Sequence, residues 1–241
     1  MCNVLRHLIT QLGIKMQWLF ITLYTIICLT ACGQTNSNNP NTNSTDITTT
    51  LTKSQKMDTV HFWKIMDYGF EKGKFDNKLK EHTILEQLVK LTPAQIQEFE
   101  IIFQQMNKKA STQGNFAAQT IIEGGSSDDR FFYFRCWLIS LGQKNFDATL
   151  ENPDYLASLD IPFNKRYGIT YCQFEALIPM ADRAYEIVTK KDPSTDTTFP
   201  RPHADRLGLF YDSGTEMTGT DWEYDDLPKI LPLLSKKYPD N

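Results

Sequence analysis

The stretch Ser126–Gly142 reads SSDDRFFYFRCWLISLG and holds the densest apolar pattern in the chain. Ser126 or Ser127 can cap a helix, and the two aspartates that follow complement the positive end of the helix dipole. Apolar side chains then cover nearly every face of the expected helix, which stops at Gly142. Because such a helix belongs in the interior of a bundle, the stretch predicts the central helix of a helical domain.

Helical periodicity continues before this stretch. Asp58 is a possible N-cap for a first helix, and Thr92-Pro93-Ala94-Gln95 combines a capping box with proline at the first helical position. Phe116 to Ile122 is a shorter helical piece that Gly124 and Gly125 close. No run of alternating strand residues stands out in the sequence, so residues 57–241 are expected to form one all-α domain.

Helical periodicity also follows the central stretch. The apolar spacing from Phe174 to Val188 predicts a long helix with a kink at Pro179. Residues 192–222 are rich in Pro, Gly, Thr and Asp and are expected to form an extended loop. The residues from Asp225 to Tyr238 predict a last helix that two internal prolines strain.

The central stretch resembles the signature of a bacterial family, the domain of unknown function 4240. The residues that carry this resemblance are Gly124, Gly125, Ser127, Asp128, Asp129, Phe131, Phe134, Arg135, Trp137, Leu138 and Ile139. Weaker matches elsewhere are Phe62-Trp63, Leu91-Thr92-Pro93, Asn152-Pro153-Asp154, Phe174-Glu175, Ala184-Tyr185 and Trp222 with Asp225-Asp226-Leu227-Pro228. The resemblance spans residues 57–238. It implies a fold, no known chemistry and no catalytic residues, and this chain departs from the usual cytoplasmic members by carrying an export signal.

The first 31 residues have the three-part form of that export signal. They contain Arg6 and Lys15 but no acidic residue, and the apolar run Trp18–Leu29 follows. This run is short for a membrane-spanning helix, which needs about 20 apolar residues. The ending Leu29-Thr30-Ala31-Cys32 resembles the lipobox of bacterial lipoproteins, which implies a diacylglyceryl group on Cys32 and cleavage before it. An uncleaved signal anchor is the alternative.

Residues 32–56 are expected to supply the acyl anchor and a flexible tether. Residues 33–56 contain 15 Asn, Ser or Thr out of 24 and no aromatic residue, so they cannot bury enough apolar surface to fold. The acyl chains on Cys32 are the expected membrane contact, with the polypeptide in the cell envelope and facing the periplasm or the exterior. Gly33 rather than Asp follows the cysteine, which by resemblance to other lipoproteins favours the outer membrane in a host that has one.

The charge pattern excludes one class of partner and favours another. The chain has a net charge of −4, and residues 57–241 carry 21 Lys and Arg against 28 Asp and Glu, a net of −7. A nucleic-acid binder normally has a basic patch, so no nucleic acid is expected as a partner, whereas a basic protein is. The sequence has no zinc-protease helix, P-loop, dinucleotide fingerprint or nucleophile elbow, and it predicts no cofactor and no resident metal.

The candidate recognition residues lie in two segments, and a structural role is the favoured interpretation of both. The residues are Asp128, Asp129, Arg135 and Trp137 in the central stretch and Trp222, Asp225 and Asp226 near the C-terminus. Their carboxylates, with that of Glu223, could instead bind a hard cation through oxygen ligands. In the structural interpretation Asp128 or Asp129 pairs with Arg130 or Arg135, and Trp222 packs on the core.

Cys136 and Cys172 are the thiols that remain once Cys32 is lipidated. An oxidising compartment permits a disulfide between them, although a free buried thiol is favoured on the apolar central helix. The leading hypothesis for function is a lipid-anchored envelope module that binds a basic partner without catalysis, for example an immunity-like protein that neutralises a toxin. The alternative is an envelope hydrolase that uses acidic residues, with or without the help of a metal.

Overall fold

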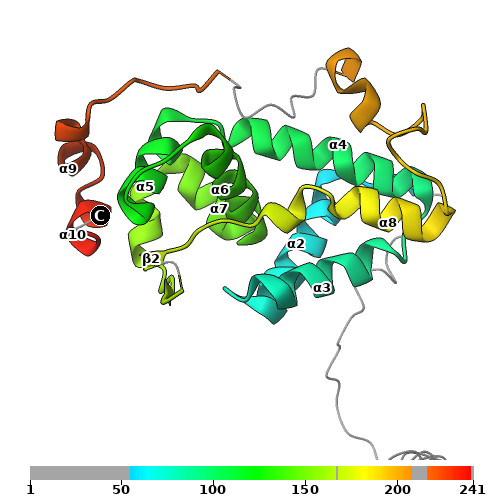
Figure 1. The fold of residues 1–241 in the computed structure, drawn as a ribbon, viewed down its shortest axis with the longest axis horizontal. Coiled ribbons are helices and arrows are strands. Elements are labelled where there is room, and N and C mark those ends of the chain that lie inside the picture. Colours follow the sequence, from blue (N-terminus) through cyan, green and yellow to red (C-terminus); the bar gives the residue numbers. More distant parts are fainter. Residues whose placement is uncertain (1–54, 167, 208–215, 240–241) are drawn as a thin grey trace, which may run out of the picture. The chain divides into compact units, whose positions relative to one another are not determined.

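The computed structural model describes residues 55–166, 168–207 and 216–239, and helices dominate it (Figure 1). The chain separates into two units, Met1–Ser44 and Thr45–Asn241, and all described residues belong to the second. The elements are α2 (Thr59–Gly73), α3 (Asn77–Leu88), α4 (Pro93–Lys109), α5 (Gln113–Glu123), α6 (Asp128–Ser140), α7 (Gln143–Glu151), the 3-10 helix η3 (Pro153–Ser158), β1 (Phe163–Asn164), β2 (Ile169–Thr170), η4 (Glu175–Leu177), α8 (Met180–Thr189), η5 (Arg201–Leu207), η6 (Tyr224–Asp226), α9 (Leu227–Ile230) and α10 (Pro232–Lys237). The expected all-α class is confirmed, and the small antiparallel hairpin of β1 and β2 is an addition to it.

The helix α6 is the central helix of the domain, as its sequence predicts. Every side chain from Phe134 to Ser140 is buried, and α6 packs against α2, α4, α5, α7 and η4. The rings of Phe134 and Trp137 stack with their centroids 5.6 Å apart. Ser127 caps the helix by accepting a hydrogen bond from the backbone N–H of Arg130 at 3.4 Å. The predicted start and the predicted burial of this helix are both confirmed.

Side-chain hydrogen bonds explain where other helices begin and end. Asp58 caps α2 by accepting a hydrogen bond from the backbone N–H of His61 at 2.8 Å. Thr92 and Gln95 form the reciprocal capping box that opens α4. Gly124 ends α5 in the left-handed conformation, with a φ of 69°, which glycine adopts without steric cost. These boundaries were predicted because each depends on neighbouring residues alone.

Gly142 makes the sharp turn between α6 and α7. Its φ is 83°, and a β-carbon at this position would lie 2.5 Å from Oδ1 of Asp67 in α2. The same oxygen accepts a hydrogen bond from the backbone N–H of Gln143 at 2.7 Å. A side chain of α2 thus stabilises the start of α7, and this close approach requires glycine.

Prolines divide two segments that the sequence predicts as single helices. The prediction of one kinked helix over Phe174–Val188 is wrong, because η4 ends before Pro179 and α8 starts after it. The predicted last helix is also split, since Leu231 leaves the helical region with φ −132° and ψ 64° just before Pro232. Proline has no N–H to continue the helical hydrogen bonds, and so the chain restarts at each site. The predicted loop over residues 192–222 contains η5.

The segment after α8 is fixed against two helices. The hydroxyl of Tyr185 in α8 donates a hydrogen bond to Oδ2 of Asp196 at 2.8 Å, and its ring centroid lies 4.9 Å from that of Phe199. Gln97 of α4 donates from Nε2 to Oγ1 of Thr198 at 3.0 Å. Because α8 itself packs along α4, these contacts hold the following loop beside both helices (Figure 1).

The C-terminal helices pack at the end of the domain that holds α5 (Figure 1). The Asp154 carboxylate in η3 accepts hydrogen bonds from the backbone N–H groups of Leu233 and Leu234, at 2.9 and 2.8 Å, and so stabilises the start of α10. Within the described residues, no helix combines the length and the apolar character that crossing a lipid bilayer requires.

Candidate functional site

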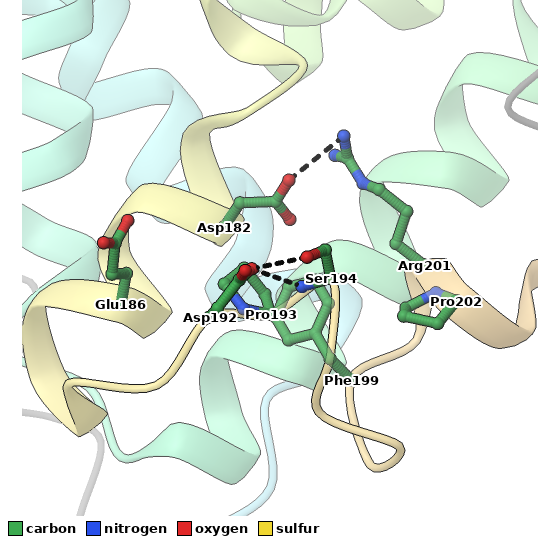
Figure 2. A pocket seen from close by; sticks show the side chains of 8 residues that line it. All are labelled: Asp182, Glu186, Asp192, Pro193, Ser194, Phe199, Arg201 and Pro202. Atoms are coloured by element: carbon green, nitrogen blue, oxygen red, sulfur yellow. Dashed lines mark hydrogen bonds and ion pairs between the residues drawn. The ribbon is translucent and has the colours of Figure 1, made fainter.

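A pocket of about 410 Å³ opens between α8, the loop that follows it and η5 (Figure 2). Its walls combine carboxylates, a guanidinium group and apolar rings. The lining residues are Asp182, Glu186, Asp192, Pro193, Ser194, Phe199, Arg201 and Pro202. Three carboxylates therefore share this lining with one guanidinium, and the pocket is acidic.

Arg201 links three elements at the pocket wall. Its Nη1 lies 3.1 Å from Oδ2 of Asp182 in α8, and its Nη2 lies 3.2 Å from Oε1 of Glu100 in α4. Nη2 also donates to the carbonyl oxygen of Ile178 at 2.6 Å. Gln104 extends this chain of contacts by donating from Nε2 to Oε1 of Glu100 at 3.2 Å. These contacts hold the guanidinium in place, because its donors point in fixed directions within one plane.

Asp182 has the perturbed carboxyl group of this pocket. Its side chain is 23% exposed, and its Oδ1 atom is shielded from solvent and accepts no hydrogen bond from the described residues. Burial raises the pKa of Asp182 to about 6, against the lowering effect of Arg201, and the negative charges of Glu100 and Asp192 raise it further. The charge of this carboxylate is thus only partly compensated by the protein.

Asp192 has the opposite environment. Its Oδ1 accepts hydrogen bonds from Oγ and the backbone N–H of Ser194, at 2.7 and 2.8 Å, and these bonds lower the pKa of the Asp192 carboxyl group. Figure 2 shows the Asp182 carboxylate directed toward Arg201, with the Asp192–Ser194 pair beside it on the loop. Asp192 therefore keeps its negative charge under mildly acidic conditions in which Asp182 is protonated.

The composition of the lining suits an organic cation better than a metal ion. Within the described ranges, no three His, Cys, Asp or Glu side chains are grouped so that they could hold a metal ion. Pro202 adds an exposed apolar surface beside the carboxylates, whereas Pro193 and Phe199, which also line the pocket, are buried. A ligand that joins a cationic hydrogen-bond donor to an apolar body would match both parts of the wall.

Of the predicted recognition residues, Asp128 and Asp129 lie exposed in the first turn of α6. Neither forms an ion pair with another described residue, so the expected pairing with Arg130 or Arg135 is wrong. Nη2 of Arg130 instead lies 3.0 Å from Oε2 of Glu123, at the end of α5. The two aspartates therefore act on the helix through its dipole and not through an internal ion pair.

Glu123 is a buried carboxylate at the centre of a hydrogen-bond network that the sequence does not predict. Its side chain has no exposed surface, and besides Arg130 it accepts hydrogen bonds from Nε2 of Gln119 at 2.9 Å and Nε2 of Gln173 at 3.0 Å. The backbone N–H of Cys172 donates to its Oε1 at 2.7 Å. This carboxylate joins α5, α6 and the segment after β2, and burial with several donors is the usual environment of a structural carboxylate.

Arg135 and Trp137 are buried in the core, with exposed fractions of 1% and 2%. The guanidinium of Arg135 lies 5.0 Å from the ring centroid of Phe131 and 5.2 Å from that of Phe132. Its Nε and Nη2 atoms form no hydrogen bond with any residue that the structure describes, and burial lowers the pKa of Arg135 to about 10. Neither residue is placed to contact a partner at the surface, because α6 presents both to the interior.

The second predicted segment packs against α5. Nε1 of Trp222 donates to the carbonyl oxygen of Gln113 at 2.9 Å, and its ring centroid lies 5.6 Å from that of Phe116. Phe116 in turn packs on Phe131 of α6, with 5.1 Å between centroids. Trp222 thus packs on the core, as its structural interpretation predicts, and the chain of rings brings the two predicted segments toward each other through α5.

Asp225 and Asp226 lie at the opposite end of the domain from the acidic pocket, because η6 and α9 are far from α8 (Figure 1). Asp225 is exposed. Oδ1 of Asp226 lies 3.2 Å from Nζ of Lys229, and its Oδ2 accepts a hydrogen bond from the backbone N–H of Glu223 at 3.3 Å. These contacts stabilise the short helices around Pro228 and do not connect the two aspartates with the pocket.

The cysteines of the domain are separate thiols in the structure. Cys136 and Cys172 are both free and buried, so the disulfide alternative is not what the structure contains. Burial raises the pKa of Cys136 to about 12 and that of Cys172 well above its ordinary value, which keeps both groups protonated and unreactive. Cys32, the predicted lipidation site, lies outside the described residues.

Residues 57–187, more than half of the chain, match the model of a family described as protein of unknown function (DUF4240). The chain belongs to this family. No curated protein and no solved structure matches it significantly. The DUF4240 span runs from the start of the folded domain into α8, so it includes the central stretch from which the resemblance was first inferred.

The DUF4240 span contains Glu100 and Asp182, whereas Asp192 and Arg201 follow it. The sequence does not predict this pocket, because no motif spacing joins residues on α4, α8 and η5. The sequence contains one indication of this site. Glu100 lies four residues after Ile96 and three before Phe103, on the apolar face of α4. A charge on a buried face indicates a partner elsewhere in the chain, but the pattern does not say which.

Proposed function

We propose that the chain is a lipid-anchored protein of the cell envelope whose DUF4240 domain binds a basic protein partner and performs no catalysis. The lipobox-like ending at Cys32 and the polar tether after it support the anchor. The acidic pocket beside α8 carries the binding proposal, because three carboxylates line it with a single guanidinium.

The charge of the whole domain supports the same class of partner. Residues 57–241 have a net charge of −7, which attracts basic proteins and raises their rate of encounter at low ionic strength. A basic toxin that acts on the envelope is one partner of this chemistry. A protein that neutralises such a toxin at the membrane would be immunity-like, and a toxin gene beside its own would support that role.

The test uses the full-length lipidated protein in envelope membranes. After chemical crosslinking and affinity capture, we expect a basic protein with the wild type and with the control Glu151→Gln, in which the changed carboxylate is exposed at the end of α7 and does not line the pocket. The double variant Asp182→Asn/Glu186→Gln should recover much less of it. Recovery of no partner, or equal recovery with the pocket variant, would contradict the proposal.

Envelope hydrolysis by acidic residues is the second candidate function, and one observation favours it. The pKa of Asp182 is raised to about 6 beside an open pocket, which suits a group that donates a proton near neutral pH. Replacement of Asp128, Asp129, Asp182, Asp225 and Asp226 by Asn, one at a time, separates the candidates. Loss of turnover of an envelope substrate in a variant that keeps its fold would establish the hydrolase.

A further inference from the structure

We propose that the acidic pocket binds a single basic side chain of the partner, with its cationic head beside Asp182 and Asp192 and its alkyl stem against Pro202. The inference rests on the proposed function and specifies its ligand. The shared chemistry is an alkyl chain that ends in a cationic N–H donor, as in lysine and arginine.

The negative charge of the Asp182 carboxylate is incompletely compensated by the described residues. A carboxylate can accept about four hydrogen bonds, yet among the described residues this one has a single ionic contact, with Arg201 through Oδ2. Its Oδ1 is shielded from solvent and has no partner in the described part of the chain, and Glu100 and Asp192 add further negative charge nearby. A cation that entered the pocket would supply the compensation that the protein lacks, in an environment where water screens charges incompletely.

The identity of the cation follows from the rest of the wall. Arg201 already lies 3.1 Å from Asp182, and its positive charge would oppose a divalent ion about twice as strongly as a monovalent side-chain cation at the same distance. The described residues offer no group of three metal-ligating side chains. Pro202 offers an exposed apolar surface that a hydrated metal ion would not use but an alkyl stem would.

The pocket is large enough to hold one basic side chain. Its volume of about 410 Å³ is near the lower end of the range for small-molecule sites, which is roughly 300–1,000 Å³. The loop that forms one wall is held by Tyr185 and Gln97, so the pocket exists before a ligand enters. Because the pocket is preformed, ligand binding orders few further protein groups and costs little conformational entropy.

Binding in this pocket is coupled to the protonation of Asp182. The charged groups that face this carboxyl group are Arg201 from η5, Glu100 from α4 and Asp192 from the loop. Because the pKa of Asp182 is raised to about 6, acidification from pH 7 to pH 5 neutralises it, while the lowered pKa keeps Asp192 charged. The affinity for a cation should therefore fall over this range, by about tenfold if binding requires ionised Asp182.

The experiment measures binding of defined probes to the full-length protein by calorimetry. The probes are N-acetyl-arginine amide, N-acetyl-lysine amide and the neutral analogue N-acetyl-citrulline amide. We expect at least one of the cationic probes to bind and citrulline to bind at least about tenfold more weakly. Asp182→Asn should lower the affinity for the cation about tenfold and abolish its dependence on pH between 5 and 7, whereas Glu151→Gln, which changes an exposed carboxylate of α7 outside the pocket lining, should change neither.

A second variant guards against loss of the fold. Glu186 lines the pocket from the exposed face of α8, so Glu186→Gln should fold normally and lower the affinity by about twofold to threefold. Binding of neither cation, equal binding of citrulline, or unchanged affinity in both pocket variants would overturn this inference. If a basic partner were still captured from membranes in that case, the proposed function would stand and only the binding of a side chain in this pocket would be wrong.

Discussion

Charged side chains in the interior of the domain are stabilised in different ways. Glu123 has donors from an arginine, two glutamines and a backbone N–H, so its charge is well compensated. In the part of the chain that the structure describes, Arg135 faces two phenylalanine rings, which attract a cation more weakly than a carboxylate does. The charge of Asp182 is compensated to an intermediate degree, because Oδ2 pairs with Arg201 while Oδ1 accepts no hydrogen bond from the described residues. The residue with the least compensated charge beside an opening is the one expected to bind a ligand.

Lys80 gives a prediction about stability and pH. Its Nζ is buried, donates to Oγ of Ser140 at 2.7 Å and lies 4.9 Å from the ring centroid of Phe174. Burial lowers its pKa to about 7 in the folded protein, against roughly 10.4 in the unfolded chain. Above pH 7 the unfolded chain binds more protons than the folded one, so the free energy of unfolding should rise with pH, by about 1 to 2 kcal/mol between pH 7 and 8.5.

Urea denaturation at several pH values measures this effect. Lys80→Met should remove the rise, and Lys78→Met, which changes an exposed lysine of the same helix, should keep it. The window ends near pH 8.5 because the thiols of Cys136 and Cys172 then ionise in the unfolded chain while burial keeps them protonated in the folded one. A wild-type stability that is constant from pH 7 to 8.5 would show that Lys80 keeps its charge.

At the level of elements, the features that depend on neighbouring residues were predictable and those that depend on distant ones were not. The caps of α2, α4 and α6 follow from short patterns, and the burial of α6 follows from its composition. The split at Pro179 was underestimated as a kink. The hairpin of β1 and β2 has only two residues in each strand, too few for an alternating pattern.

The same limit applies to the candidate site. Asp182 lies on α8, Glu100 on α4 and Arg201 on η5, and only tertiary packing brings the three together. The recognition residues proposed from the sequence come from one dense stretch and from a weak motif. Of these, the dense stretch supplies core residues such as Trp137, and Trp222 packs on the core as well. Residues with the most distinctive local pattern were therefore mainly structural.

The capping box of α4 gives a prediction at this scale. Oγ1 of Thr92 accepts a hydrogen bond from the backbone N–H of Gln95 at 3.3 Å, and Oε1 of Gln95 accepts one from the backbone N–H of Thr92 at 2.9 Å. Thr92→Ala removes one of these acceptors and should lower the free energy of unfolding by about 1 kcal/mol, measured by urea denaturation. Thr92→Ser keeps the hydroxyl group and should lose much less. Equal losses in the two variants would mean that packing of the methyl group, not the cap, stabilises the helix start.

At the scale of the whole molecule, the charge of the folded domain cannot supply its attachment to the membrane. A domain with a net charge of −7 is repelled by anionic lipid, so electrostatic attraction cannot hold it at a membrane. The same negative charge favours a basic partner, and the pocket places three carboxylates close together. A protein with this charge that works at the envelope therefore needs an attachment that does not depend on its folded surface, and acyl chains on a cysteine provide one.

Replacement of Cys32 tests that attachment. Metabolic labelling with a fatty acid should label the wild type, and its mature N-terminus should be Cys32, whereas Cys32→Ala should be unlabelled and keep its first 31 residues. The control Cys28→Ala should be labelled and cleaved normally, because Cys28 lies within the apolar run and no small residue precedes it. Label on Cys32→Ala would refute the lipobox. An unlabelled but membrane-bound wild type would instead favour the signal anchor, whose apolar run would then hold the same acidic domain at the membrane.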